Sequence, residues 1–98
     1  MTSLLNNQIF SVLIIREDNS WSAQCLEYDI AIQSKTLKDI PLEFEKTLEY
    51  NIIVCEQLNI KPFTHDRAPN DFHTVYKENA FPIQLSDKIN INYRIGNY

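Results

Sequence analysis

Three short apolar segments come first in the chain, and each has the pattern of a β-strand. Ile9 to Ile15 is apolar on both faces, which is typical of a strand covered on both sides, so we expect it at the centre of a sheet. Trp21 to Leu26 alternates apolar and polar residues after the turn-forming cluster Asp18-Asn19-Ser20, so the first two strands are predicted to form a hairpin. After Glu27-Tyr28-Asp29, the segment Ile30 to Ser34 is predicted as a third strand.

The hydrophobic period then changes to that of a helix, which is predicted to run to about Leu58. Its core stripe consists of Leu37, Ile40, Phe44, Leu48, Ile52 and Cys55. Thr36 can cap this helix, with the carboxylate of Asp39 in the first turn. Pro41 leaves the start open: the helix either begins after Thr36 and tolerates the proline, or begins near Ile40 after a looser turn.

The second half of the chain is predicted to contain one more helix and one more strand. Asn59-Ile60-Lys61-Pro62 ends the long helix, and Pro69 offers a second start. The short helix that follows ends before Phe81-Pro82 and has one apolar face, made of Phe72, Val75 and Tyr76. From Lys88 to Ile95 the residues alternate strictly, as in a half-buried strand with Ile89, Ile91, Tyr93 and Ile95 on its apolar side.

These elements predict an α+β fold in a single domain spanning residues 1–98. Its core, residues 8–58, is a three-stranded antiparallel sheet with a long helix packed on it, and residues 62–98 add a short helix and a C-terminal edge strand. An unpaired strand edge is a template for association. The last strand is therefore expected to pair with a sheet, either that of its own chain or that of a second copy, and we expect a dimer.

The charge pattern narrows the classes of partner. The 98 residues have a net charge of −4, and the nine lysines and arginines are scattered, so a direct contact with nucleic acid is not expected. An acidic domain suits a basic protein partner, although solubility alone explains the charge more simply. Residues 1–8 lack the pattern of a signal peptide and there is no long apolar run, so we expect a cytoplasmic protein without a membrane span.

The residues that carry chemistry do not form a recognisable catalytic or cofactor motif. Cys25 and Cys55 lie within apolar patterns, so both are expected to be buried and reduced. His65 and His73 lack partners at ligand spacing and are expected on the surface. Gly96 is the only glycine, which excludes a glycine-rich loop that cradles phosphate. The sequence therefore predicts a protein that is not an enzyme, with no catalytic, cofactor-binding or metal-binding residues.

Three carboxylates keep one alternative open. Glu27, Asp29 and Asp39 are expected near one edge of the sheet, where a metal-dependent nuclease would place its ligands. Turn and capping roles explain the same residues more simply.

The long helix also has apolar residues outside its core stripe. Leu42 and Ile53 lie on the opposite face, among Glu45, Lys46, Glu49 and Glu56. We expect the short C-terminal helix to cover this face, since its own apolar side must be buried; a second subunit is the alternative.

The stretch from Phe10 to Leu58 resembles the HicB-like antitoxin domain, a truncated RNase H-like fold. The likeness rests on the apolar first strand, on Trp21 to Ala31 (WSAQCLEYDIA) and on Gln33 to Leu37 (QSKTL) before the long helix. The chain is more similar still to stand-alone bacterial HicB-like proteins of uncharacterised function, which share a WxAQCLEYDIAxQxKTL stretch. The pairs Pro62-Phe63, Ala68-Pro69 and Arg94-Ile95 also recur in those proteins.

The resemblance implies a non-catalytic protein-binding module. Its expected partner is a small basic mRNA interferase of the HicA type, or a second copy of the chain. Residues 62–98 do not have the order of a ribbon-helix-helix or helix-turn-helix module, so the DNA binding of many HicB antitoxins is not expected. The candidate partner-binding residues are Glu27, Tyr28, Asp29, Leu42 and Ile53. The alternative function is a metal-dependent RNase H-like hydrolase that uses Glu27, Asp29 and Asp39.

Overall fold

The chain folds around a five-stranded mixed sheet with the strand order β3-β2-β1-β5-β4. The computed structural model describes residues 8–63, 66–85 and 90–96. The elements are, in chain order, β1 (Phe10–Arg16), β2 (Trp21–Cys25), β3 (Ala31–Ser34), the 3-10 turn η1 (Leu37–Asp39), α2 (Ile40–Gln57), α3 (Asn70–Glu78), β4 (Ala80–Ile83) and β5 (Ile91–Gly96). The fold is therefore α+β, as predicted, but its sheet has five strands rather than three.

The first three strands form the predicted antiparallel meander. Val12 of β1 lies opposite Cys25 of β2, and Ala23 of β2 lies opposite Ile32 of β3. On its other side β1 pairs in parallel with β5, where Phe10 lies opposite Ile91. The expectation that β1 is central is confirmed, which explains why it is apolar on both faces.

We expected from the sequence that the C-terminal strand lies at the edge of the sheet, and this expectation is wrong. β5 lies between β1 and β4, and β4 forms the edge of the sheet. In this structure the strand pairs within its own chain, with β1 on one side and β4 on the other. Of the predicted strand Lys88 to Ile95, Lys88 and Ile89 lie outside the described residues. β4 was missed because Phe81-Pro82 suggested only a helix end, whereas an edge strand tolerates a proline that donates no hydrogen bond.

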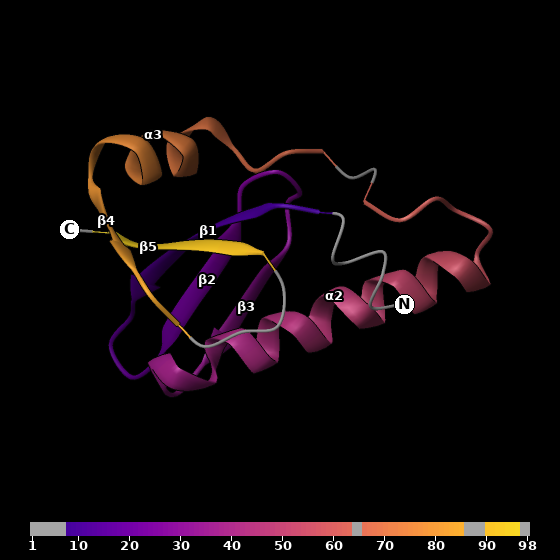
Figure 1. Ribbon diagram of the computed structural model, residues 1–98, viewed down its shortest axis with the longest axis horizontal. Helices are drawn as coiled ribbons and strands as arrows, with labels where there is room; N and C mark the ends of the chain where they lie inside the picture. The colour runs from indigo at the N-terminus through magenta and orange to yellow at the C-terminus, as the bar shows by residue number, and fades with distance from the viewer. Residues whose placement is uncertain (1–7, 64–65, 86–89, 97–98) are drawn as a thin grey trace.

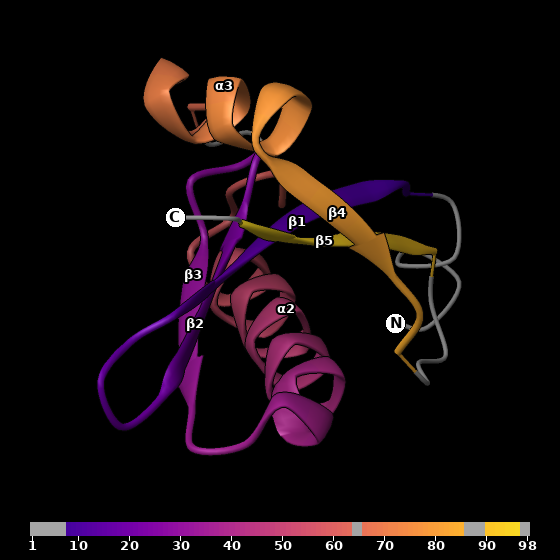
Figure 2. The same cartoon turned by 90° about the vertical axis from the view of Figure 1, so that its left-hand side faces the viewer.

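The two helices cover opposite faces of the sheet (Figures 1 and 2). The buried stripe of α2 packs on the face that carries the alternate residues Phe10, Val12 and Ile14 of β1. On the other face Phe72, Val75 and Tyr76 of α3 pack against Leu13, Leu26 and Ala68. The expectation that the C-terminal helix covers Leu42 and Ile53 is therefore wrong, because the second face of the sheet offers its apolar side a larger partner.

The start of α2 decides between the two alternatives left by Pro41. The helix begins at Ile40, with Pro41 in its first turn, where a missing N–H costs nothing, and the looser turn before it is η1. The hydroxyl of Thr36 donates a hydrogen bond to the carboxylate of Asp39 (2.7 Å). Within the described chain this hydroxyl makes no capping bond to a backbone N–H, so the predicted cap is replaced by a side-chain pair that closes the turn.

Both cysteines are free and buried, as predicted from their apolar surroundings. The pKa of the Cys25 thiol is raised from 9.0 to about 12, mainly because burial disfavours the thiolate. Backbone hydrogen bonds from Tyr28 and Glu27 oppose the rise, and the charge of Glu27 adds to it. The neutral thiol is therefore the form that the fold favours.

This pKa predicts that the protein loses stability in alkali. The unfolded chain loses the Cys25 proton near pH 9, whereas the folded chain keeps it to about pH 12. The contribution is therefore complete below pH 9, and between these values the free energy of unfolding should fall by about 1.4 kcal/mol per pH unit. Urea unfolding across this range measures the slope. Cys25→Ala should reduce it, and a slope that only Cys55→Ala reduces would contradict the assignment.

Candidate functional site

The turn after β2 holds three of the predicted partner-binding residues, and each has contacts within the fold. Glu27 Oε1 accepts a hydrogen bond from the backbone N–H of Ser11 (2.8 Å). Asp29 Oδ1 accepts one from Gln24 Nε2 (2.9 Å), and the Asp29 N–H donates to the carbonyl of Asp66 (2.8 Å). The two carboxylates join the turn to β1 and to β2, and the backbone N–H of Asp29 joins it to the chain before α3.

Tyr28 closes the same turn onto the core. Its ring packs edge-on against Phe10 (6.2 Å between centroids) and tilted against Phe63 (5.4 Å). The Tyr28 hydroxyl donates to Gln8 Oε1 (3.1 Å). Burial raises the pKa of this hydroxyl, with smaller contributions from Cys25 and Glu27. Tyr28 therefore contributes to the packing of the core.

The carboxylates of the nuclease alternative do not converge. Glu27 and Asp29 lie in the turn between β2 and β3, whereas Asp39 follows the far end of β3 and accepts the hydroxyl of Thr36. Within the part of the chain that the structure describes, no group of three or more His, Cys, Asp or Glu side chains could hold a metal ion. The expectation that the three acids share one edge of the sheet is therefore wrong.

The two remaining candidates, Leu42 and Ile53, lie on the side of α2 that faces away from the sheet. Leu42 is 53% exposed and Ile53 is 37% exposed. Tyr50 is 68% exposed, and at 100° per residue the three fall within an arc of about 80°. We call these three residues the outer stripe of α2. Sequence reasoning missed Tyr50, although its helical spacing from Ile53 is a signal that was present.

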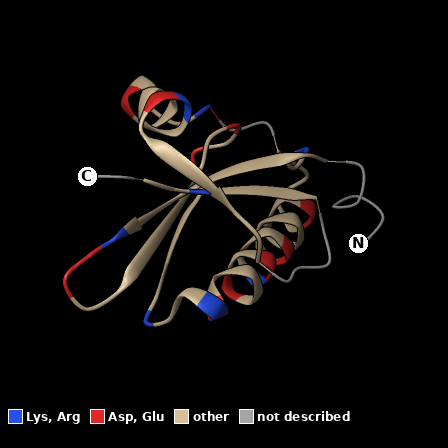
Figure 3. Ribbon diagram, turned by 60° about the vertical axis from the view of Figure 1, so that its left-hand side comes forward, with Lys and Arg blue, Asp and Glu red and all other residues tan. Residues whose placement is uncertain are grey.

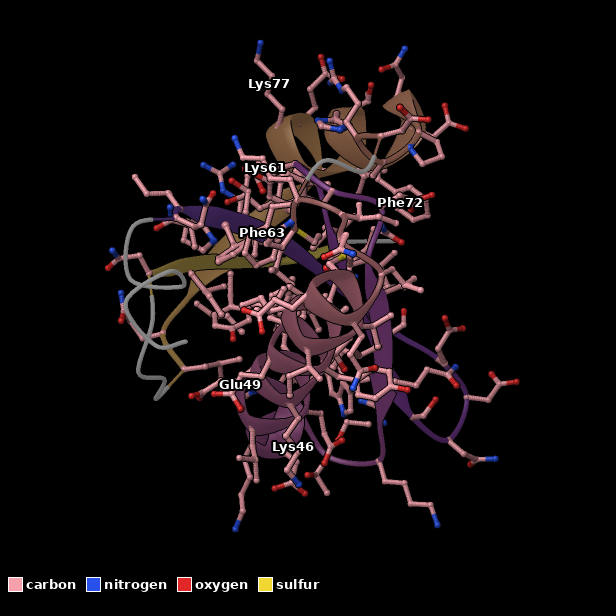
Figure 4. All side chains as sticks on the ribbon, turned by 90° about the vertical axis from the view of Figure 1, so that its right-hand side faces the viewer. Lys46, Glu49, Lys61, Phe63, Phe72 and Lys77 are labelled. Atoms are coloured by element: carbon pink, nitrogen blue, oxygen red, sulfur yellow. The ribbon has the colours of Figure 1, made fainter. Side chains whose placement is uncertain are left out.

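Acidic side chains flank the outer stripe along one side. Glu45, Glu49 and Glu56 lie within about 40° of one another on the helix, adjacent to Leu42 and Ile53. Figure 3 shows the acidic residues spaced along α2, and Figure 4 shows Glu49 beside Lys46 on this helix. Lys46 is the one cation of α2 and lies 3.9 Å from Glu43. The outer stripe therefore has a negatively charged border.

The five predicted residues do not make one surface. Leu42 lies at the start of α2, and the turn that carries Glu27, Tyr28 and Asp29 is at the opposite end of β3. The outer stripe, with its glutamates, is thus the better defined of the two candidate surfaces. None of the described helices is long and apolar enough to cross a membrane.

The histidines complete the set of predicted residues. His73 is half-buried rather than fully solvated, and its Nε2 accepts a hydrogen bond from Arg67 Nε (3.4 Å). His65 lies outside the described residues.

Comparison with known proteins gives no relative for this chain. A scan against family models, a search of curated proteins and a search of solved structures each return no match.

Proposed function

We propose that the protein is a non-catalytic binding module of the HicB-like antitoxin type, which docks a small basic protein on the outer stripe of α2. The observation that carries this proposal is the combination of Leu42, Tyr50 and Ile53 with the acidic border beside them. Apolar residues rimmed by charge are the usual composition of a protein interface. The negatively charged border favours a positively charged partner, because complementary charge steers association and suppresses wrong partners.

The glutamates of this border are unfavourable to their own helix. Glu45 and Glu49 are four residues apart, where like charges destabilise a helix by about 0.2–0.5 kcal/mol. Glu56 lies in the last turn of α2, where the helix dipole disfavours a negative charge and where the helix has no basic residue. A basic partner would relieve both costs, so a binding role accounts for charges that helix stability does not.

The sequence resemblance supplies the class of partner. The order β1-β2-β3-α2, with α2 packed on the sheet, supports the β-β-β-α unit that a HicB-like domain implies. An mRNA interferase of the HicA type is a small basic protein and is therefore the partner to test first. Self-association through the same stripe is the other outcome that the experiment distinguishes.

The test uses paired substitutions of exposed residues. Leu42→Ser with Ile53→Ser should weaken binding to a HicA-type interferase at least about tenfold, since each removes an apolar contact at the centre of the interface. Phe81→Ser is the matched control, because Phe81 is 62% exposed on β4. Titration calorimetry gives the affinities, and rescue of growth in cells that express the interferase gives the activity.

A second set of variants tests the charge. Replacing Glu45, Glu49 and Glu56 together by glutamine should slow association and flatten its salt dependence, while folding stability is kept or raised. Glu78→Gln on α3 is the control. The proposal fails if the chain neither rescues growth nor co-purifies with a stoichiometric basic protein. If light scattering instead shows a dimer that the Leu42 and Ile53 variants convert to monomer, the stripe binds a second copy.

A further inference from the structure

A basic groove lies on the opposite side of the molecule from α2, between α3 and the sheet. It has a volume of about 480 Å³. Its lining residues are Ser11, Leu26, Glu27, Arg67, His73, Tyr76, Lys77 and Arg94. Figure 4 shows Lys77 on α3, far from Glu49 and Lys46 on α2. The groove is thus separate from the outer stripe, and the inference below does not depend on the proposed function.

Arg94, one of the two arginines that line the groove, is held in place by contacts within the fold. Arg94 Nη1 donates to the backbone carbonyl of Tyr76 (3.0 Å), and the guanidinium lies 4.7 Å from the centre of the Tyr76 ring. The Tyr76 hydroxyl in turn donates to the carbonyl of Asn92 (3.0 Å), so both ends of the tyrosine are fixed. A guanidinium held in this way loses little freedom when it binds an anion.

The second arginine is also restrained, and it comes from a different part of the chain. Arg67 precedes α3 and donates from Nε to His73, one turn before Lys77 on the same helix. Arg67, Lys77 and Arg94 therefore reach the groove from the loop, the helix and β5 respectively.

Within the part of the chain that the structure describes, the positive charges of these three cations are not balanced by ion pairs. Among the described residues, none of Arg67, Lys77 and Arg94 forms an ion pair with a carboxylate. Glu27 is the one acid among the described residues that line the groove, and its Oε1 accepts hydrogen bonds from the N–H of Ser11 and the thiol of Cys25 (3.7 Å). With three cations and one carboxylate, the groove has an excess of two positive charges in a chain whose net charge is −4.

We propose that this groove binds the phosphate group of a small phosphorylated molecule. A phosphate monoester has a charge of about −1.5 to −2 at neutral pH, which matches the excess of the groove, and its oxygens fit the donors of arginine. The volume is in the range of small-molecule sites. Because the donors are side chains from three elements, the site does not need the glycine-rich loop that the sequence lacks.

Ribose 5-phosphate is a suitable probe, with ribose as its uncharged counterpart. Titration of the full chain, followed by amide chemical shifts in NMR at constant ionic strength, should give saturable changes at Arg67, His73, Lys77 and Arg94, and none with ribose. Lys77→Gln should weaken binding about tenfold through loss of one charge-assisted contact, and Arg94→Gln at least as much. Lys77 is exposed, so its variant keeps the fold even if that of Arg94 does not.

The matched control is Lys35→Gln, which removes an exposed charge in the turn after β3 and should leave the affinity unchanged. A parallel titration with inorganic phosphate distinguishes the two sources of the anion. Equal affinity means that the phosphate alone is recognised, and tighter binding of the sugar phosphate means that the sugar is contacted too; both support the site. Shifts that do not saturate, or an equal loss in Lys35→Gln and Lys77→Gln, would overturn it.

Discussion

Replacing Phe44 with alanine is expected to lower the free energy of unfolding by about 3–5 kcal/mol. Phe44 is fully buried on the sheet side of α2, and its ring packs edge-on against Phe10 of β1 at 6.2 Å. The substitution removes that aromatic contact and leaves a cavity between the helix and the sheet, which a close-packed core fills only in part. The loss is a large part of the ~5–15 kcal/mol available to a domain.

Leu42→Ala in the same helix is the control for this measurement. Leu42 is exposed, so the change should cost less than about 1 kcal/mol in urea unfolding of the isolated protein. A loss for Leu42→Ala as large as that for Phe44→Ala would show that another surface covers the outer stripe in solution. Leu48→Ala, which also removes a fully buried side chain, should fall near the value for Phe44→Ala, at about 2–5 kcal/mol.

The elements that could be predicted from the sequence are those whose signal is local. The stripe from Ile40 to Cys55 repeats at the helical period over four turns, and every member of it is buried in α2. The alternation of Trp21 to Leu26 next to a turn cluster likewise needs only neighbouring residues to form a hairpin with β1.

The parts that could not be predicted depend on contacts between distant segments. Alternation in Ile91, Tyr93 and Ile95 shows that a strand has one buried side, but it does not say which strands lie beside it. β4 has four residues, one of them a proline, and is too short for a period of two to be recognised. The position of α3 was equally open, because packing on α2 or on the sheet would bury the same apolar residues.

The same distinction between local signals and contacts of distant segments applies to the two candidate sites. Leu42 and Ile53 were found because helical spacing alone places them together on α2. The cations Arg67, Lys77 and Arg94 look scattered in the sequence, and only the pairing of β5 with β1 beneath α3 brings them to one groove. A scattered distribution of charge along a chain is therefore weak evidence against a local charged site.

Removal of residues 87–98, which takes away β5, is expected to abolish cooperative folding. β5 is the inner strand that joins β1 to β4, so its loss leaves β1 with an unpaired edge and β4 with no partner strand. It also removes Tyr93, which is buried, and Ile91 and Ile95, which pack against the same core. The lost burial and the lost ladder hydrogen bonds together exceed the stability of an ordinary domain of this size.

Thermal unfolding followed by circular dichroism tests this expectation, with light scattering of the same samples. The full chain should melt in one cooperative step, and the truncated chain should show no such step. Asn92→Ala in the full chain is the control, because this exposed side chain on β5 should change the free energy of unfolding by less than about 0.5 kcal/mol. A truncated chain that still melts cooperatively, at half the mass of the full-length protein, would mean that β5 pairs between two copies. That result would contradict the parallel pairing of β5 with β1 of its own chain.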